Sequence, residues 1–359
     1  NKMKFGIYKK DIQAPLEKLS RLIPRRTTLP ILHCVKMDFN GSYLTLTAGS
    51  IETTMTIKVN ATPIDGETGV VCVDLKQFLG TIKKMPNVGI RLEVEGNTMT
   101  INFDTGKINL PLLPAEEYPA TPKVDGGKLN VDSKVMSKVE KAFNFTSDSD
   151  LRPALCGVYF DTVNGNIVGT NGHAMYMSSG LSKDSGVEPF ILTEEAYAGI
   201  KGLEVSTIMV GEAHAFIEGE NFYITARLID GNFPNYKSVI PENDVKYISN
   251  LEALRTSVDR ALLCTDELTS LVMFEFNDAI YVKTRDKEAG TSFKEKVECN
   301  GEHKDEVGLN GKYLLSCLNA LDSKDVIITF MDNNRPLTIH PMSEDLEENE
   351  LILLMPMMI

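Results

Sequence analysis

The sequence has no long apolar run and no closely spaced cysteine pair. Its longest apolar stretches are short pieces such as Leu351–Met355, whereas a membrane-spanning helix needs about 20 apolar residues in a row. Residues 1–10 contain no apolar segment of the kind found in signal peptides, so we expect neither a membrane association nor a secretory leader. None of the six cysteines forms a C-x-x-C pair, which gives no support to a zinc knuckle or a disulfide framework and favours a reduced, cytoplasmic setting.

Positively charged residues are fewer than negatively charged ones. The chain has 37 lysines and arginines against 50 acidic residues, a net charge of −13, which argues against a simple basic nucleic-acid binder. Apolar residues make up 42% of the sequence and charged residues 24%, values typical of folded proteins, so extensive disorder is excluded. A length of 359 residues predicts two or three domains.

Motifs for common enzyme chemistry are missing. There is no dinucleotide fingerprint after a strand, no P-loop, no H-E-x-x-H and no G-x-S-x-G, and the five histidines lack metal-ligand spacing. We therefore expect no metal and no cofactor. His173, in GTNGHAMY, is the most enzyme-like residue, and a hydrolase centred on it is one alternative. The interpretation we favour is a histidine in a turn that packs or hydrogen-bonds near a groove.

Six amphipathic segments occur in two sets of three with a common period. Asp11, Asp132 and Asn250 open the first set at intervals of 121 and 118 residues, and Asp74, Thr193 and Asn310 open the second at 119 and 117. Each opener can accept hydrogen bonds from the free N–H groups of a first helical turn. The predicted helices are 12–24, 74–85, 132–143, 193–203, 250–263 and 310–322. Two markers with one period indicate a threefold internal repeat.

The segments between these helices have the pattern of strands joined by tight turns. Asn40-Gly41, Asn164-Gly165 and Asn277-Asp278 mark one hairpin in each third, and a second hairpin follows each second helix near 96–97, 219–221 and 332–334. The fold class predicted is α+β, with two helices packed on an antiparallel sheet in each repeat. Proline-rich exits at 110–122 and 230–241 place domain boundaries at 1–122, 123–242 and 243–359.

Charge is unevenly placed along the chain. The six predicted helices together carry +3, which leaves −16 for the rest. Lysines such as Lys76, Lys138 and Lys141 lie on the polar faces of the first three of these helices. Any one of them is ordinary helix surface, but together they predict a weakly basic surface able to follow phosphates without reading bases. The apolar end LILLMPMMI predicts either a core strand or the wall of a binding groove.

With these residues in view, the sequence resembles the bacterial DNA sliding clamp, the beta subunit of DNA polymerase III. The motifs that carry the resemblance are TLPIL at 28–32, TNGH at 170–173, GNFPNY at 231–236 and the terminal MPMMI, in order along the whole chain. The resemblance implies a head-to-tail homodimer that closes a six-domain ring around double-stranded DNA, independent of sequence. It also implies tethering of the DNA polymerase III alpha subunit, the clamp loader, other polymerases and repair proteins.

The resemblance further implies a pocket for a short partner peptide, formed between the second and third repeats and the C-terminus. Matched residue by residue, the pocket would use Leu155, Thr170, Gly172, His173, Met175, Pro234, Val239, Tyr313, Leu353, Met355, Pro356 and Met357. Arg26 and Arg152 match loop arginines that contact duplex DNA in the family. The dimer contact would pair Lys107, Ile108 and Leu110 with Leu262 and Leu263 of the partner chain.

Several positions depart from the family pattern. Ala174, Ser238 and Met358 stand where members of the family often have arginine, and Pro153 and Ala154 replace aromatic residues. These changes remove positive charge from the pocket rim and point to an altered partner set. A third interpretation is therefore a diverged clamp-like scaffold that binds peptides but does not encircle DNA.

Overall fold

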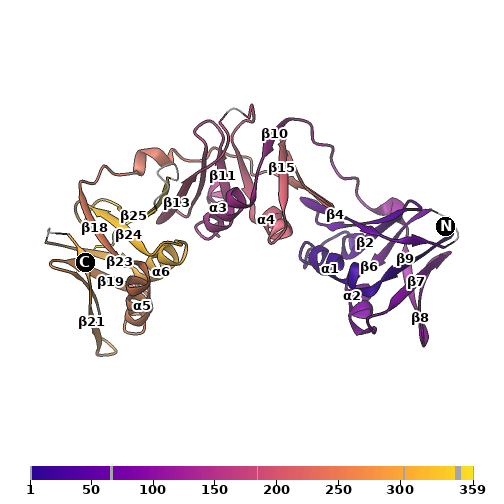
Figure 1. Ribbon diagram of the computed structural model, residues 1–359, viewed down its shortest axis with the longest axis horizontal. Helices are drawn as coiled ribbons and strands as arrows, with labels where there is room; N and C mark the ends of the chain where they lie inside the picture. Colours follow the sequence, from indigo (N-terminus) through magenta and orange to yellow (C-terminus); the bar gives the residue numbers. More distant parts are fainter. Residues whose placement is uncertain (1, 65–67, 184, 302–303, 344–348, 359) are drawn as a thin grey trace. The chain divides into compact units, whose positions relative to one another are not determined.

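The computed structural model describes the chain except residues 1, 65–67, 184, 302–303, 344–348 and 359 (Figure 1). In the described residues, each third has the same order of elements: a strand, a helix, four or five strands, a second helix and three strands. This order confirms the α+β fold and the threefold repeat.

The bounds of the elements follow the repeat. The first third contains β1 (Lys2–Tyr8), α1 (Lys9–Leu19), β2 (Cys34–Phe39), β3 (Tyr43–Gly49), β4 (Thr53–Asn60), β5 (Thr62–Pro63), β6 (Gly69–Asp74), α2 (Leu75–Lys84), β7 (Gly89–Glu95), β8 (Thr98–Phe103) and β9 (Gly106–Leu113). The second contains β10 (Gly127–Asn130), α3 (Ser133–Phe143), β11 (Gly157–Asp161), β12 (Asn166–Thr170), β13 (Ala174–Ser179), β14 (Phe190–Thr193), α4 (Glu194–Ile200), β15 (Val205–Val210), β16 (His214–Gly219) and β17 (Phe222–Arg227). The third contains β18 (Val245–Asn250), α5 (Leu251–Leu262), β19 (Leu271–Phe276), β20 (Ile280–Asp286), β21 (Thr291–Val297), β22 (Cys299–Asn300), β23 (Asp305–Asn310), α6 (Gly311–Asn319), β24 (Asp325–Phe330), β25 (Leu337–Pro341) and β26 (Glu350–Leu354).

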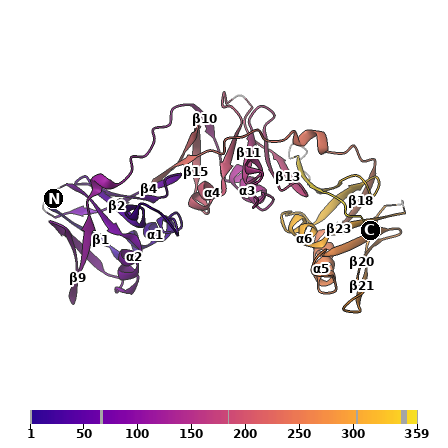
Figure 2. The same ribbon diagram turned by 180° about the vertical axis from the view of Figure 1, so that it is seen from behind.

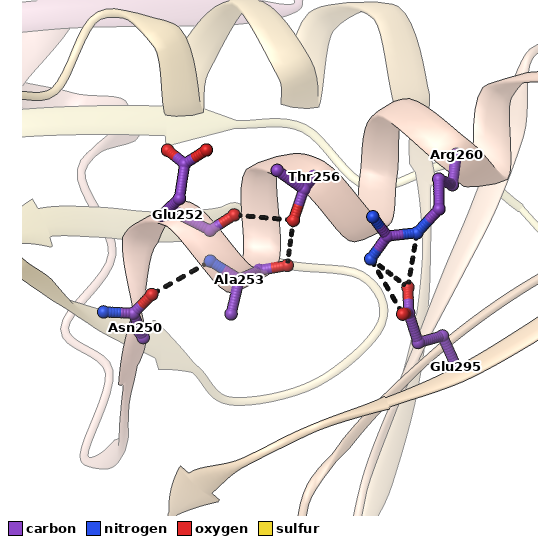
Figure 3. A network of polar contacts seen from close by, with 6 residues as sticks. All are labelled: Asn250, Glu252, Ala253, Thr256, Arg260 and Glu295. Carbon is purple, nitrogen blue, oxygen red and sulfur yellow. Dashed lines mark hydrogen bonds and ion pairs between the residues drawn. The ribbon is translucent and has the colours of Figure 1, made fainter.

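Helix starts follow the capping logic in most cases. The side chains of Asp74, Thr193, Asn250 and Asn310 accept hydrogen bonds from backbone N–H groups in the first turns of α2, α4, α5 and α6, as predicted. Figure 3 shows the cap of α5, where Asn250 accepts from the N–H of Ala253 at 3.0 Å. The prediction that Asp11 opens the first helix is wrong. Strand β1 runs directly into α1, which begins at Lys9 and places Asp11 in its first turn.

The hairpin predictions are confirmed. Pairs such as Phe39 with Leu44, Asp161 with Asn166 and Phe276 with Ile280 close the three first hairpins. The second hairpins join β7 to β8, β16 to β17 and β24 to β25. Tight turns fix the register of these strands, and the register decides which side chains face the core.

The chain forms two compact units. Unit 1 comprises Asn1–Ser133, Ser185–Glu188 and Thr193–Leu228. Its thirteen-stranded antiparallel sheet has the order β10-β15-β16-β17-β4-β3-β2-β6-β9-β8-β7-β1-β5, and α1 lies beside α2 (Figure 1). Strand β4 of the first third pairs with β17 of the second, from Thr53–Ala226 to Ile57–Phe222. The sheet of unit 1 therefore runs without a break from the first repeat into part of the second.

Unit 2 comprises Lys134–Asp184, Pro189–Leu192 and Ile229–Ile359. It has a nine-stranded sheet, β14-β11-β12-β13-β26-β25-β24-β18-β22, and a four-stranded sheet, β21-β20-β19-β23. Strand β13 of the second third pairs with β26 of the third. Helices α5 and α6 lie side by side (Figure 2). The same junction, the fourth strand of one third paired with the last strand of the next, thus occurs once in each unit.

Candidate partner-peptide site

The TNGH segment forms a tight turn between β12 and β13. The side-chain oxygen of Asn171 accepts hydrogen bonds from the N–H groups of His173 and Ala174, both at 2.9 Å. The hydroxyl of Thr170 donates to the carbonyl of Ala174 at 2.8 Å. These side-chain bonds satisfy the turn backbone locally and hold His173 exposed at its tip. Asn171 is a residue that the sequence analysis did not single out.

Gly172 is required at this turn for its backbone conformation. Its φ of +88° is in the left-handed region that side-chain-bearing residues avoid. A Cβ at this position would also lie 3.0 Å from Nη1 of Arg152. The guanidinium of Arg152 is therefore packed directly over the turn.

His173 stacks on Tyr313 of α6, with ring centroids 5.7 Å apart and planes within 10°. This pair borders a cleft of about 550 Å³ in unit 2. The cleft is lined by Asn144, Phe145, Thr146, Ser147, Asp148, Ser149, Arg152, Asn171, His173, Ala174, Tyr313 and Ser316. The interpretation of His173 as a turn residue that packs beside a groove is confirmed.

The C-terminal residues reach the same place through strand β26. Leu351–Leu354 are buried and pair with β13, from Leu351–Met177 to Leu354–Ala174. The N–H of Met355 then donates to the carbonyl of His173 at 2.9 Å, and the N–H of Met357 donates to the carbonyl of Gly308 at 2.8 Å. Met355 is 38% exposed. The apolar segment at the C-terminus is thus a core strand, Glu350–Leu354, followed by a partly exposed tail.

An apolar cluster lies on the strands that carry the turn and the tail. Two predicted pocket residues, Met175 and Leu353, belong to it. The full cluster is Val168, Met175, Met177, Tyr236, Leu351 and Leu353, with Tyr159, Phe233 and Ile240 packed against it. The rings of Tyr159 and Phe233 stack with centroids 4.5 Å apart. Apolar floors beside a few fixed polar groups are typical of ligand sites.

Tyr236 fixes the 230–241 segment to the sheet, a role that the sequence analysis missed. Its hydroxyl donates to Oδ2 of Asp161 at 2.6 Å and accepts from the amide of Asn166 at 2.9 Å. Burial of Asp161 opposes its ionisation, but hydrogen bonds from Tyr236 and Asn164 outweigh this and lower its pKa. The signal was available, because the quoted GNFPNY motif ends at Tyr236.

The remaining predicted pocket residues lie around these features. Leu155 is buried at the end of the short 3-10 helix Pro153–Leu155, which follows the cleft-lining loop. Pro234 and Val239 are exposed in the segment that Tyr236 anchors. Pro356 lies between the two tail hydrogen bonds. All twelve predicted pocket residues are in unit 2.

The predicted DNA-contacting residues are differently placed. Arg26 and Lys76 are exposed in unit 1, and Arg152 is exposed at the cleft in unit 2. The ammonium of Lys138 donates to the carbonyl of Ser179 at 2.9 Å. Lys141 forms ion pairs with two carboxylates of unit 2. The charges of these last two lysines are therefore engaged within the protein.

The predicted dimer residues lie on two separate elements. In β9 of unit 1, Lys107 is exposed, Ile108 is half-buried and Leu110 is buried. At the end of α5 in unit 2, Leu262 is half-buried and Leu263 is 84% exposed. Arg260 binds both oxygens of Glu295 in β21 at 2.7 and 2.9 Å (Figure 3), which fixes the last turn of α5 to that strand.

Within the described part of the chain, no group of three or more His, Cys, Asp or Glu side chains is arranged to hold a metal ion. The helices described there are all too short or too polar to cross a membrane. The site is instead a cleft bordered by the stacked pair of His173 and Tyr313, the two predicted pocket residues among its lining. The apolar cluster lies on the strands that flank the TNGH turn, and the tail is hydrogen-bonded to that turn at His173. The fold and the site define a repeat-built protein with a surface cleft beside its C-terminal tail.

Comparison with known proteins identifies the family. A family model described as DNA polymerase III beta subunit, N-terminal domain, matches residues 3–122, and one described as the C-terminal domain of the same subunit matches residues 237–357. The beta sliding clamp of Pseudomonas aeruginosa is 26% identical over 99% of this chain and all of that protein. That of Staphylococcus aureus is 26% identical over 96% and 97%. The chain belongs to the DNA polymerase III beta subunit family, the beta sliding clamps.

Solved structures agree with this assignment. A sliding clamp from P. aeruginosa, crystallised with griselimycin, superposes with a TM-score of 0.90 at 23% identity over the full length of both chains. A beta sliding clamp from C. crescentus gives 0.91 at 22% identity, also over both full lengths. The clamp from Thermotoga maritima gives 0.87 at 20% identity, over 99% of this chain and all of that one. The shared fold thus extends over the whole chain.

Proposed function

We propose that this protein is a DNA sliding clamp, a processivity factor that encircles duplex DNA and tethers replication and repair proteins. The observation that carries this function is the cleft of unit 2 in a member of the beta clamp family, lined by the TNGH turn to which the C-terminal tail is hydrogen-bonded. The chain is a non-catalytic subunit, and neither the hydrolase nor the scaffold that does not encircle DNA is favoured.

The partner segment would be a short extended peptide with apolar anchors. The floor around Met175 and Leu353 would bury its apolar side chains, and the polar groups around His173 and Arg152 would orient it. We assign the pocket to the twelve residues named above. The partners would be the polymerase alpha subunit, the clamp loader, other polymerases and repair proteins. Because Ala174, Ser238 and Met358 carry no charge, affinity for acidic peptides should be low.

Closure of a ring follows from the repeat. Inside the chain, the fourth strand of one repeat pairs with the last strand of the next, as β4 with β17 and β13 with β26. By the same rule, β21 of the third repeat would pair with β9 of a second copy. Strand β21 is an edge of its sheet, and among the described residues Gly106–Pro111 of β9 pair only with β8. A heterologous contact used twice closes a head-to-tail dimer.

This dimer would bring Lys107, Ile108 and Leu110 against Leu262 and Leu263 of the other copy. Unpaired edge strands readily pair with another chain, and an exposed apolar side chain such as Leu263 is stabilised by burial. The three domains would be residues 1–122, 123–242 and 243–359. In support, β9 ends at Leu113 and β10 begins at Gly127, and the N-terminal family model ends at residue 122.

DNA would be held by charge without base recognition. Arg26, Lys76 and Arg152 offer exposed positive groups on a protein of net charge −13. Weak, sequence-independent contacts allow sliding, because no single position on the duplex is preferred. The protein acts on DNA in the cell interior, and we assign it to the cytoplasm.

A fluorescence-anisotropy titration with a peptide of the Q-L-x-L-F type tests the proposal. We expect saturable binding by the full chain, in the micromolar range of about −8 kcal/mol, and its loss on removal of residues 355–359. A scrambled peptide is the matched control. Failure of a folded dimer to bind would overturn the pocket assignment, and failure of a protein that is also monomeric would overturn the clamp function.

A further inference from the structure

Lys141, in the last turn of α3, joins this helix to two other segments near the cleft. Its ammonium nitrogen lies 2.9 Å from Oδ2 of Asp322, just after α6, and 3.1 Å from Oε1 of Glu350, the first residue of β26. Helix α3 continues into the loop that lines the cleft up to Arg152, α6 carries Tyr313, and β26 continues into the tail. One side chain therefore links α3 to the end of the helix that carries Tyr313 and to the strand that leads into the tail.

The contact is largely shielded from water at its centre. The side chains of Lys141 and Glu350 are 17% and 13% exposed. The hydroxyl of Tyr176 donates to the same oxygen of Glu350 at 2.8 Å, and the Tyr176 ring stacks on Phe145 of the cleft. Burial favours the neutral form of Lys141, but Asp322 and Glu350 outweigh it and raise its pKa. Shielded pairs of this kind are less weakened by salt than exposed ones.

Glu350 is the first residue of the strand that leads into the tail. Strand β26 pairs with β13 from Glu350–Ser178 to Leu354–Ala174, and the next hydrogen bond joins Met355 to His173. A shift of one residue at the start of the strand would turn its buried side chains to the other face. The ion pair at the first residue is therefore placed to fix the register on which the tail depends.

We propose that Lys141 is a positioning residue for the peptide cleft, which holds α3, the end of α6 and β26 together so that the tail lies against His173. This inference rests on the proposed peptide-binding function. It also replaces the expectation that Lys141 contacts DNA, because its charge is directed at two carboxylates of its own chain.

The test is the peptide titration with three variants of the full chain. Lys141→Met should weaken binding about tenfold, within the range found for residues that couple to a site without touching the ligand. Lys141→Arg should restore most of the affinity, because it keeps the charge. Lys134→Met, an exposed lysine on the same helix, should bind as the wild type does. Equal affinity of Lys141→Met and the wild type would overturn the inference, whereas failure of the wild type itself would overturn the proposed function.

Amide hydrogen exchange distinguishes a role of Lys141 in positioning the tail from a general loss of stability of unit 2. Exchange should rise at Met355 and Met357 in Lys141→Met and stay unchanged in β11 and β12. A uniform rise across unit 2 would contradict a positioning role. If Lys141→Met does not fold, Glu350→Gln gives the same test, because it keeps the volume and the contact with Tyr176 while removing the charge. Loss of salt-dependent DNA binding with normal peptide binding would instead assign Lys141 to DNA.

Discussion

The backbone N–H of Met355 donates a hydrogen bond of 2.9 Å to the carbonyl oxygen of His173. The two residues come from different repeats, and the bond joins the tip of the TNGH turn to the beginning of the C-terminal tail. The imidazole of the same residue stacks on Tyr313 at the border of the cleft. A binding surface of this kind depends on two distant parts of the chain at once.

Replacement of His173 by alanine should weaken peptide binding without unfolding the protein. The variant removes an aromatic ring that borders the cleft. One aromatic contact with a bound peptide contributes about 0.5–1.5 kcal/mol beyond its buried area, which corresponds to a roughly two- to tenfold loss of affinity. The anisotropy titration measures this loss. His214→Ala, in β16 of unit 1, is the control and should bind normally. Unchanged binding by His173→Ala would remove this residue from the pocket.

Replacement of Tyr236 by phenylalanine should lower the free energy of unfolding by about 1–3 kcal/mol. The buried Oδ2 of Asp161 would keep only its hydrogen bond from Asn164, and the amide of Asn166 would lose its acceptor. The pKa of Asp161 is lower in the folded state than in the unfolded state. Its stabilising contribution is therefore present above the unfolded pKa of about 3.9 and is lost as the pH falls through the folded pKa.

The difference between Tyr236→Phe and the wild type should thus be largest above about pH 5 and should shrink in acid. Denaturant unfolding over a pH series measures it. Tyr223→Phe, at a partly exposed tyrosine of unit 1, is the control and should show no such pH dependence. A difference that stays constant down to pH 2 would show that the hydrogen bond to Asp161 is not its source.

Local signals in the sequence account for most of the fold. Asn250 and Asn310 cap their helices because capping depends only on residues within one turn, and Asn40-Gly41 closes its hairpin for the same reason. The prediction for the start of α1 is wrong because β1 runs directly into this helix at Lys9. Asp11 therefore lies inside the first turn and not at the position that precedes the helix.

The site was only partly predictable. The assignment of twelve residues to the pocket came from the family motifs and stays a prediction. The anchor of Tyr236 on Asp161 and the ion pairs of Lys141 join residues far apart in the chain. Such contacts depend on which strands become neighbours, as β13 and β26 do. No local pattern around Lys141 distinguishes it from the exposed lysines of the same helices.

Replacement of Lys76 by alanine should weaken binding to duplex DNA equally for all sequences. Removing one phosphate contact should reduce the slope of log K against log salt by about 1. Titration of short duplexes at several salt concentrations measures the slope. Lys58→Ala removes an exposed lysine from β4 and should leave the slope unchanged. An equal change in both variants would mean that net charge, and not a defined surface, controls DNA binding.

Replacement of Leu263 by lysine should shift the protein from dimer to monomer. The change places a charge in the proposed contact with β9 of the second copy, and truncation of a buried interface side chain commonly costs about 2 kcal/mol or more. Sedimentation equilibrium gives the mass. Leu151→Lys, at an equally exposed leucine elsewhere, should remain dimeric. A dimeric Leu263→Lys protein would place the contact on another surface.

The most direct test of the ring is retention on DNA of different topology. The labelled protein is loaded onto nicked circular duplex with the clamp loader of its own organism, and the complex is then filtered before and after linearisation by a single cut. A ring linked to DNA should stay on the circle at high salt and leave within minutes after the cut. Equal retention on circular and linear DNA, or no retention on either by a dimer, would contradict the account.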